Sequence, residues 1–175
     1  DLHYPLRRQR QMCIGDSSKI AVLGSGTMGG QIAAHFANLG FEVVMFDTSK
    51  DALSKSLGMM TKLKPPPFAS SSIAKSIKTS TYDSMDALSN CDFIIESIVE
   101  NLDIKKQLFA NIAPYVSDDA ILVTNTSGLS IQKIAEHAPE HLRSRIFGVH
   151  FFNPPRYMPL VCLLYTSDAA DEEDS

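Results

Sequence analysis

The sequence predicts an α/β fold in which helices cover both faces of a doubly wound, mainly parallel sheet. Short apolar runs alternate along the chain with segments whose apolar residues recur at helical spacing. A strand, a helix and a further strand in succession build a parallel sheet, because the helix carries the chain back to the edge where it started. Strands are expected at residues 20–23, 42–46, 78–82, 92–97, 120–124 and 145–149, and helices at 50–63, 85–90 and 101–112.

The first expected helix follows the strand Ile20–Leu23. Its apolar face is formed by residues 28, 32, 36 and 39, and Gly40 is expected to end it. The helix expected over 50–63 must end at Pro65–Pro67, since proline has no N–H group to donate. The run Ser70–Ser72 is typical of a loop or of a helix start.

A glycine motif separates the first strand from the first helix. Gly24, Gly26 and Gly29 have the spacing G-x-G-x-x-G. In such a motif Gly24 allows a tight turn, Gly26 lets the backbone approach a pyrophosphate, and Gly29 permits close helix–strand contact. The spacing alone also occurs in glycine turns of unrelated proteins. The strand before it and the helix after it favour a Rossmann-type dinucleotide site.

Asp47 is the second feature of this predicted site. It ends the strand expected at 42–46 and lies 23 positions after Gly24. A carboxylate there accepts hydrogen bonds from an adenosine ribose and repels a 2′-phosphate, which favours NAD over NADP. The alternative interpretation is an aspartate that caps the next helix.

His150 lies where an apolar strand gives way to a loop stiffened by Pro154 and Pro155. The carboxyl edge of a parallel sheet is its ligand edge, and an imidazole can accept and return a proton near neutral pH. His150 is therefore a candidate catalytic base. Taken alone, a histidine beside Phe151 and Phe152 is also typical of a packed core residue.

Two further polar clusters follow predicted strands at the same edge, at residues 96–101 and 124–127. Glu100 and Lys105 would reach the ribose and nicotinamide half of the cofactor, and the Ser127 hydroxyl would bond a substrate oxygen near His150. Each has a structural alternative: Glu100 as a charge at a helix N-terminus, Lys105 as a solvated side chain, and Ser127 as a turn former.

One DNA sequence accounts for both ends of the chain. Back-translation of Asp1–Ser17 gives a transposase-type sequencing-library adapter with its index, and one base change repairs the single mismatch at Gly15. The reverse complement of that DNA, read one base in, encodes Cys162–Ser175 without a mismatch. We therefore expect residues 1–17 and 162–175 to be non-native flanks and residues 18–161 to be an NAD-binding domain that is incomplete at its C-terminus.

Composition restricts the partners of residues 18–161. The two flanks hold three of the 16 basic and seven of the 20 acidic residues, which leaves 13 of each and no net charge. Neither nucleic acid nor a membrane is indicated, and no apolar run approaches the length of a membrane span. Cys91 is the only cysteine outside the flanks, so no disulfide framework or cysteine-based zinc site is expected and a reducing compartment such as the cytoplasm is favoured. The sequence does not indicate targeting.

Five motifs together resemble the 3-hydroxyacyl-CoA dehydrogenases. They are GSGTMGGQIA at residues 24–33, Asp47, ESIVEN at 96–101, NTSGLSI at 125–131 and GVHFFNP at 148–154. The resemblance covers residues 19–161, and the LKPPPF and NPPRYM segments resemble the large bacterial multifunctional β-oxidation proteins more than the short stand-alone enzymes.

The resemblance implies an NAD-dependent oxidation of an L-3-hydroxyacyl-CoA to a 3-ketoacyl-CoA in fatty acid β-oxidation. It implies that His150 takes the hydroxyl proton and Ser127 bonds the substrate. The residues that it implies for the cofactor are Gly24, Gly26, Thr27, Met28, Gly29, Asp47, Glu100, Lys105 and Asn153; it implies no metal.

Two departures from the family bear on activity. The family has a glutamate, which orients the histidine, at the position of Cys162, and it has a helical C-terminal domain that closes the substrate cleft and forms the dimer. We expect this chain to be an inactive fragment of an active parent, which is a homodimer or part of a multifunctional complex. Two alternatives remain: a non-catalytic dinucleotide-binding module, and a relative that acts on a sugar acid. The sequence indicates neither the acyl chain length of the substrate nor whether a hydratase is fused to the dehydrogenase.

Overall fold

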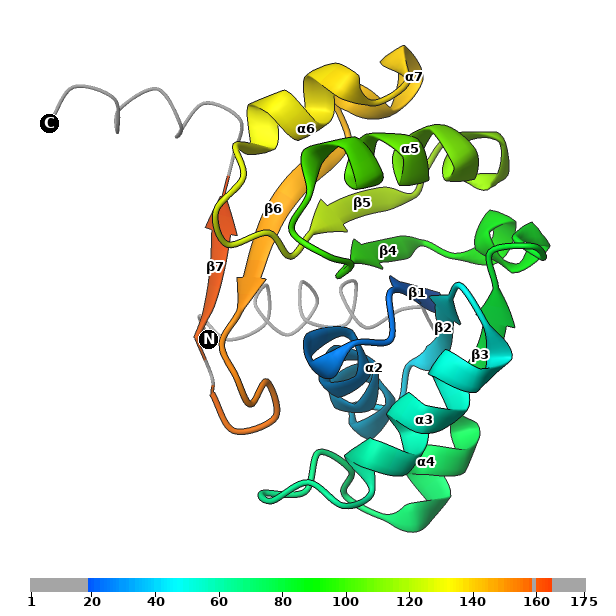
Figure 1. Ribbon diagram of the computed structural model, residues 1–175, viewed down its shortest axis with the longest axis vertical. Coiled ribbons are helices and arrows are strands. Elements are labelled where there is room, and N and C mark those ends of the chain that lie inside the picture. Colours follow the sequence, from blue (N-terminus) through cyan, green and yellow to red (C-terminus); the bar gives the residue numbers. More distant parts are fainter. Residues whose placement is uncertain (1–18, 159, 165–175) are drawn as a thin grey trace, which may run out of the picture.

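Seven strands form one sheet among the residues that the computed structural model describes, 19–158 and 160–164, and their order is β3-β2-β1-β4-β5-β6-β7. The strands are β1 Lys19–Leu23, β2 Glu42–Asp47, β3 Lys78–Thr81, β4 Phe93–Glu96, β5 Ile121–Thr124, β6 Ile146–Phe151 and β7 Val161–Leu164. The first six pair in parallel, and β7 pairs antiparallel with β6 (Figure 1). This arrangement confirms the predicted α/β fold with a doubly wound, mainly parallel sheet.

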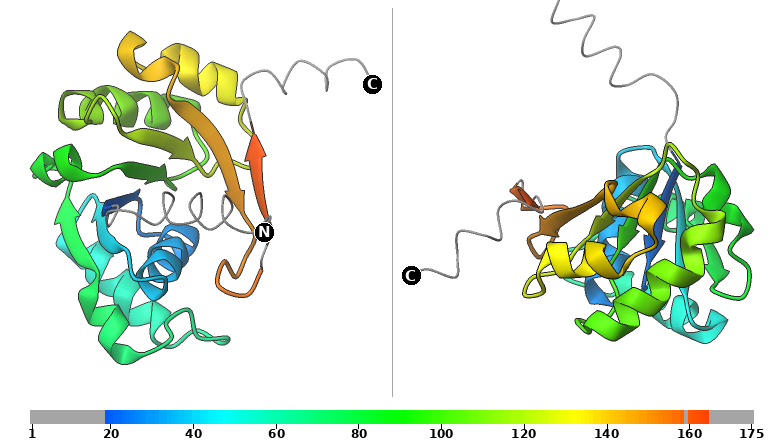
Figure 2. Two further views of the ribbon diagram at one scale, coloured as in Figure 1. Left: turned by 180° about the vertical axis from the view of Figure 1, so that it is seen from behind. Right: turned by 90° about the horizontal axis from the view of Figure 1, so that it is seen from above.

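Helices lie on both faces of the sheet (Figure 2). They are α2 Thr27–Asn38, α3 Lys50–Met60, α4 Ser71–Ser76, α5 Leu102–Ile112, α6 Ile131–His137 and α7 Glu140–Arg143, with short 3-10 helices η1 Asp86–Asn90 and η2 Ala113–Tyr115. The first three pack on one face, and α5, α6 and α7 pack on the other (Figure 1). The sheet is therefore buried on both sides at its centre, as parallel sheets require.

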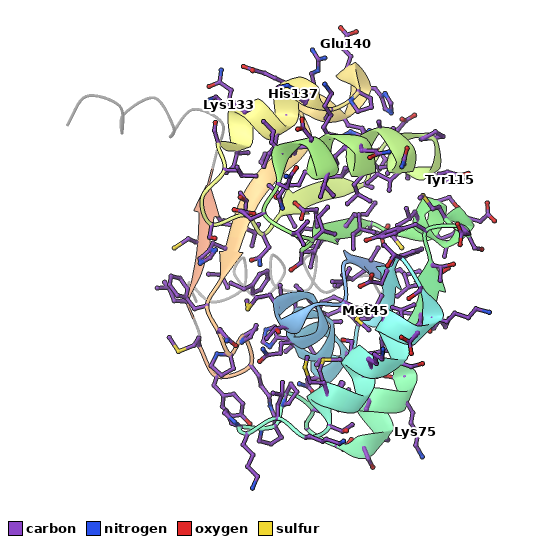
Figure 3. All side chains as sticks on the ribbon, in the orientation of Figure 1. Met45, Lys75, Tyr115, Lys133, His137 and Glu140 are labelled. Carbon is purple, nitrogen blue, oxygen red and sulfur yellow. The ribbon has the colours of Figure 1, made fainter. Side chains whose placement is uncertain are left out.

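Alternation along the strands divides the core into two layers. In β1, Ala21 and Leu23 belong to the layer under α5, whereas Ile20 and Val22 belong to the layer under α2. Met45 is fully buried in the second layer, while the labelled charged side chains Lys75, Lys133 and Glu140 point away from the fold (Figure 3). The strands are apolar at consecutive positions because helices bury both faces of the sheet.

The structure confirms most of the predicted elements and corrects some details. Leu39 is wrong as part of the apolar face of α2: it is 60% exposed, because α2 ends at Asn38 and Gly40 then turns the chain with a φ of +91°. The short helix expected at residues 85–90 is present as a 3-10 helix over Asp86–Asn90. The last parallel strand continues through Phe151, because β7 pairs with its end.

Strand β7 was not predicted. It contains residues 162–164 of the second expected flank, while residues 1–17 and 165–175 of the two flanks lie outside the described residues. Within the described part of the chain, none of the helices combines the length and apolarity needed to cross a membrane.

Candidate functional site

The parallel strands end at one edge of the sheet, and the loops that follow them surround a cleft of about 960 Å³. Nine of the eleven predicted site residues line this cleft. They are Gly24, Gly26, Thr27, Met28, Asp47, Glu100, Ser127, His150 and Asn153. Gly29 and Lys105 lie behind the lining. Residues that are up to 129 positions apart in the sequence therefore meet at one surface, as expected for the ligand edge of an open α/β sheet.

The glycine turn is held by close backbone contacts. Gly24 has a φ of +99°, and its N–H donates to the carbonyl of Phe46 at 2.8 Å. A Cβ atom on Gly29 would lie 2.0 Å from the Gly24 carbonyl oxygen, whereas one on Gly26 would meet no atom within 4 Å. Among the residues that the structure describes, no side chain caps the start of α2, and the first turn of α2 has no acidic residue. A helix start without a side-chain cap, next to a glycine with open space at its Cβ position, is the arrangement that binds an anion.

Asp47 is held as an ionised acceptor beside this turn. One carboxylate oxygen accepts from the N–H of Ser25 at 2.7 Å and from its hydroxyl, and the other accepts from the N–H of Thr48 at 2.7 Å and its hydroxyl at 3.1 Å. Burial alone would raise the pKa of Asp47, but these hydrogen bonds outweigh it and lower the pKa below its usual value. A ribose hydroxyl that bonds Asp47 must displace one of these two rotatable hydroxyls.

Glu100 binds the loop that carries Ser127. Its Oε1 accepts from the Thr126 hydroxyl and from the N–H groups of Ser127 and Gly128, both at 2.9 Å. Burial alone would raise the pKa of Glu100, but these bonds and the Lys105 ammonium hold it at about 2. Glu100 is thus an anion at neutral pH, with its side chain 39% exposed at the cleft.

Lys105 does not reach the cleft directly. Its side chain is 1% exposed, and its Nζ lies 2.6 Å from Glu96 Oε1 and 3.4 Å from Glu100 Oε2. The lysine therefore stands behind Glu100, between two carboxylates.

His150 extends from β6 into the cleft. Its ring packs edge-on against Phe152 with the centroids 5.2 Å apart, and its Nδ1 is buried without a hydrogen-bond partner among the described residues. Cys162 lies directly opposite on β7, so the two side chains share one face of the sheet. The adjacent N–H of Phe151 donates to Asn125 Oδ1 at 3.0 Å, which ties this strand end to the loop of Ser127.

Asn153 follows His150 in the loop that leaves the sheet. Its Oδ1 accepts a hydrogen bond from Gln31 Nε2 at 3.0 Å. Helix α2, which carries Gln31, therefore holds the loop that follows His150. The two ends of the cleft are therefore linked through α2.

A family model described as the NAD-binding domain of 3-hydroxyacyl-CoA dehydrogenase matches residues 19–173. The chain belongs to the 3-hydroxyacyl-CoA dehydrogenase family.

Individual relatives agree with that family assignment. A putative fatty acid oxidation complex trifunctional enzyme of Rickettsia felis is 40% identical over 157 residues, which cover 85% of this chain and 22% of the relative. A probable 3-hydroxyacyl-CoA dehydrogenase of Bacillus subtilis is 35% identical over 165 residues, with coverage of 82% and 21%. The crystal structure of 3-hydroxybutyryl-CoA dehydrogenase from Escherichia coli has a TM-score of 0.71 at 33% identity, with coverage of 85% and 32%. The chain thus spans about a fifth of the two relatives and a third of the solved chain.

The cofactor of the dehydrogenase domain is NAD, and the residues at the glycine turn fit it. The start of α2 can receive a pyrophosphate beside Gly26, where no atom of the described residues lies within 4 Å of the Cβ position. Asp47, ionised beside this turn, can accept from an adenosine ribose and disfavours a 2′-phosphate.

Several residues of the site were not predicted from the sequence. Ser25 and Glu96 are paired with site residues, and their hydrogen bonds appear only when strands meet in the sheet. Tyr82 also lines the cleft; burial raises its pKa far above the usual value, and the charges of Asp47 and Glu96 add to this, so that it stays a donor. A lone tyrosine after a weak strand matches no recognisable pattern. Glu96, in contrast, belongs to the motif ESIVEN together with Glu100, and that motif is a signal from which it could have been found.

Substitution of the two motif glycines separates folding from cofactor binding. Gly29→Ala places a methyl group against the Gly24 carbonyl, so we expect a loss of about 1–3 kcal/mol in the free energy of unfolding. Gly26→Ala has open space and a φ of −60°, so its stability should change by roughly 0.5 kcal/mol or less. Its methyl group nevertheless occupies the approach of a pyrophosphate, and NADH affinity should fall.

Chemical denaturation and NADH fluorescence titration measure the two effects. Equal stability of the two variants would contradict the close approach of Gly29 to Gly24. Unchanged NADH affinity of Gly26→Ala would place the pyrophosphate elsewhere.

Glu100 gives the fold a defined pH dependence. Because its folded-state pKa is lowered from 4.5 to about 2, its stabilising contribution is fully present above the unfolded pKa and is lost as pH falls from 4.5 towards 2. The difference in free energy of unfolding between wild type and Glu100→Gln should therefore be constant near neutrality and shrink below pH 4.5. Denaturation at a series of pH values measures it, with the exposed Glu140→Gln as control. A difference that is independent of pH would show that Glu100 is not held as an anion by its loop.

Proposed function

We propose that the complete protein oxidises L-3-hydroxyacyl-CoA to 3-ketoacyl-CoA with hydride transfer to NAD in fatty acid oxidation. The observation that carries this proposal is the position of His150, which lines the same cleft as the glycine turn and Ser127. A base beside a dinucleotide site is what the oxidation of an alcohol requires, because a proton and a hydride must leave together.

The roles of the residues follow from their surroundings. The nicotinamide ring of bound NAD supplies the hydride acceptor. Since His150 Nδ1 is buried, Nε2 is the nitrogen that takes the proton from the substrate hydroxyl. The Ser127 hydroxyl donates to the same substrate oxygen and positions it.

Three further residues serve the cofactor. Glu100 accepts from the nicotinamide ribose, and Lys105 supports this acceptor from behind. Asn153, fixed by Gln31, completes the wall of the cleft beside His150.

We propose residues 18–161 as the native NAD-binding domain, with residues 1–17 and 162–175 as adapter-derived flanks. In this account the native residue opposite His150 is a glutamate, which would bond the open Nδ1, fix the tautomer and stabilise the imidazolium. The Cys162 thiol, a weak hydrogen-bond partner, does not replace that glutamate, so the 175-residue chain is catalytically inactive.

We also propose that the complete protein is cytoplasmic and has a helical C-terminal domain that closes the acyl-CoA cleft. That domain forms either a homodimer or part of a multifunctional complex. The trifunctional relative, of which this chain matches 22%, supports the second arrangement.

Activity of the complete gene product tests the proposed function. The gene is recovered across the Val161 junction, where a glutamate is expected at position 162, and NAD reduction is followed with L-3-hydroxybutyryl-CoA. His150→Asn should lower kcat about 10²–10⁴-fold while NADH still binds, because only the proton acceptor is lost. His141→Asn on the exposed side of α7 is the matched control and should be unchanged.

Three results would overturn the proposal. Binding of NADH without turnover would indicate a non-catalytic dinucleotide module. Faster turnover of a sugar acid such as gulonate would identify another substrate class. Full activity of His150→Asn would remove the assigned base.

A further inference from the structure

Glu96 is a charged residue at the ligand edge to which the proposed reaction assigns no role. It ends β4, is 0% exposed and does not line the cleft. Its Oε1 accepts from the N–H of Ile98 at 2.8 Å and from Lys105 Nζ at 2.6 Å, and its Oε2 accepts from the Thr124 hydroxyl at 2.5 Å. A buried carboxylate is tolerated only when it is paired and hydrogen-bonded, and Glu96 meets both conditions.

The partners of Glu96 lead to both ends of the catalytic region. Lys105 also contacts Glu100, whose other oxygen holds the turn at residues 126–128. The backbone carbonyl of Glu96 accepts from the N–H of Asn125 at 2.8 Å, and the Asn125 side chain accepts from the N–H next to His150. Glu96 thus connects β4 with the loop of Ser127 and with the end of β6, through both its side chain and its backbone carbonyl.

Two carboxylates compete here for one ammonium group. Lys105 Nζ is 2.6 Å from Glu96 but 3.4 Å from Glu100, so Glu96 takes the closer bond. Glu100 therefore keeps Oε1 for the turn at 126–128 and remains anionic at the cleft surface. Without the charge of Glu96, the ammonium would be drawn onto Glu100 and would compete with a ligand for the same carboxylate.

We propose that Glu96 is a positioning residue of the NAD site: by holding Lys105, it keeps the Glu100 carboxylate and the turn at residues 126–128 in the geometry that receives the nicotinamide half of the cofactor. The inference rests on the proposed function only where it assigns Glu100 to the nicotinamide ribose and Ser127 to the substrate. Its test reads cofactor binding and loop protection, which do not require acyl-CoA turnover.

Glu96→Gln in the complete protein tests the proposal, because glutamine keeps the size and one carbonyl oxygen but removes the charge. The NADH dissociation constant should rise about tenfold, the loss expected for one charge-assisted hydrogen bond. Hydrogen exchange at the Ser127 and Gly128 amides should accelerate, while kcat falls less than the affinity. Thr124→Val, which leaves the ion pair intact, is the matched control and should change the dissociation constant less than threefold.

A double-mutant cycle with Lys105→Met shows whether Glu96 acts through the lysine. Glu96→Gln combined with Lys105→Met leaves no unpaired buried charge, so this variant should fold even where either single variant does not. If Glu96 acts through Lys105, the double variant should bind NADH no more weakly than Lys105→Met alone.

Two results would overturn the proposal: NADH affinity and amide exchange of Glu96→Gln that match wild type, or effects of the two substitutions that simply add. Should the double variant be the only one that folds, NADH affinity equal to that of wild type would overturn the proposal too. If wild type binds NADH but does not oxidise an acyl-CoA, the proposed function fails while this inference stands.

Discussion

Lys105 places an ammonium group where the sheet edge excludes water, and the arrangement of the loops around the cleft follows from how that charge is balanced. Glu96 balances it from the end of β4, and Glu100 approaches it from the loop that follows. A buried charge without a partner would be strongly destabilising, so these three side chains have few alternative positions. Because Glu100 accepts hydrogen bonds from the turn at residues 126–128, the position of this turn is restricted as well.

A second, independent constraint acts at the other end of the cleft. The contact between Gly24 and Gly29 brings α2 against β1, and Asp47 is fixed by the hydroxyl and N–H of Ser25 inside the same turn. The adenosine half of the cofactor thus meets a rigid backbone turn, and the nicotinamide half meets a network of charged side chains. Gln31 on α2 connects the two regions through Asn153.

Much of this was predictable from the sequence, because apolar runs, glycine spacing and proline breaks act locally. The order of strands and helices, the glycine turn, and Asp47, Glu100, Ser127 and His150 at the cleft follow from such signals. Lys105 shows where they stop: on a helix with alternating polar residues it looks like a solvated side chain, yet it is 1% exposed because Glu96 lies beneath it. Tyr82 and β7 likewise depend on contacts between distant segments, which no local pattern records.

Titration of the 175-residue chain with NADH and NADPH, followed by calorimetry, tests most directly the claim that this edge is an NAD site. We expect saturable binding of NADH and an affinity for NADPH at least about tenfold lower, because the ionised Asp47 repels the 2′-phosphate. Equal or tighter binding of NADPH, or no binding of either nucleotide by the folded chain, would contradict it.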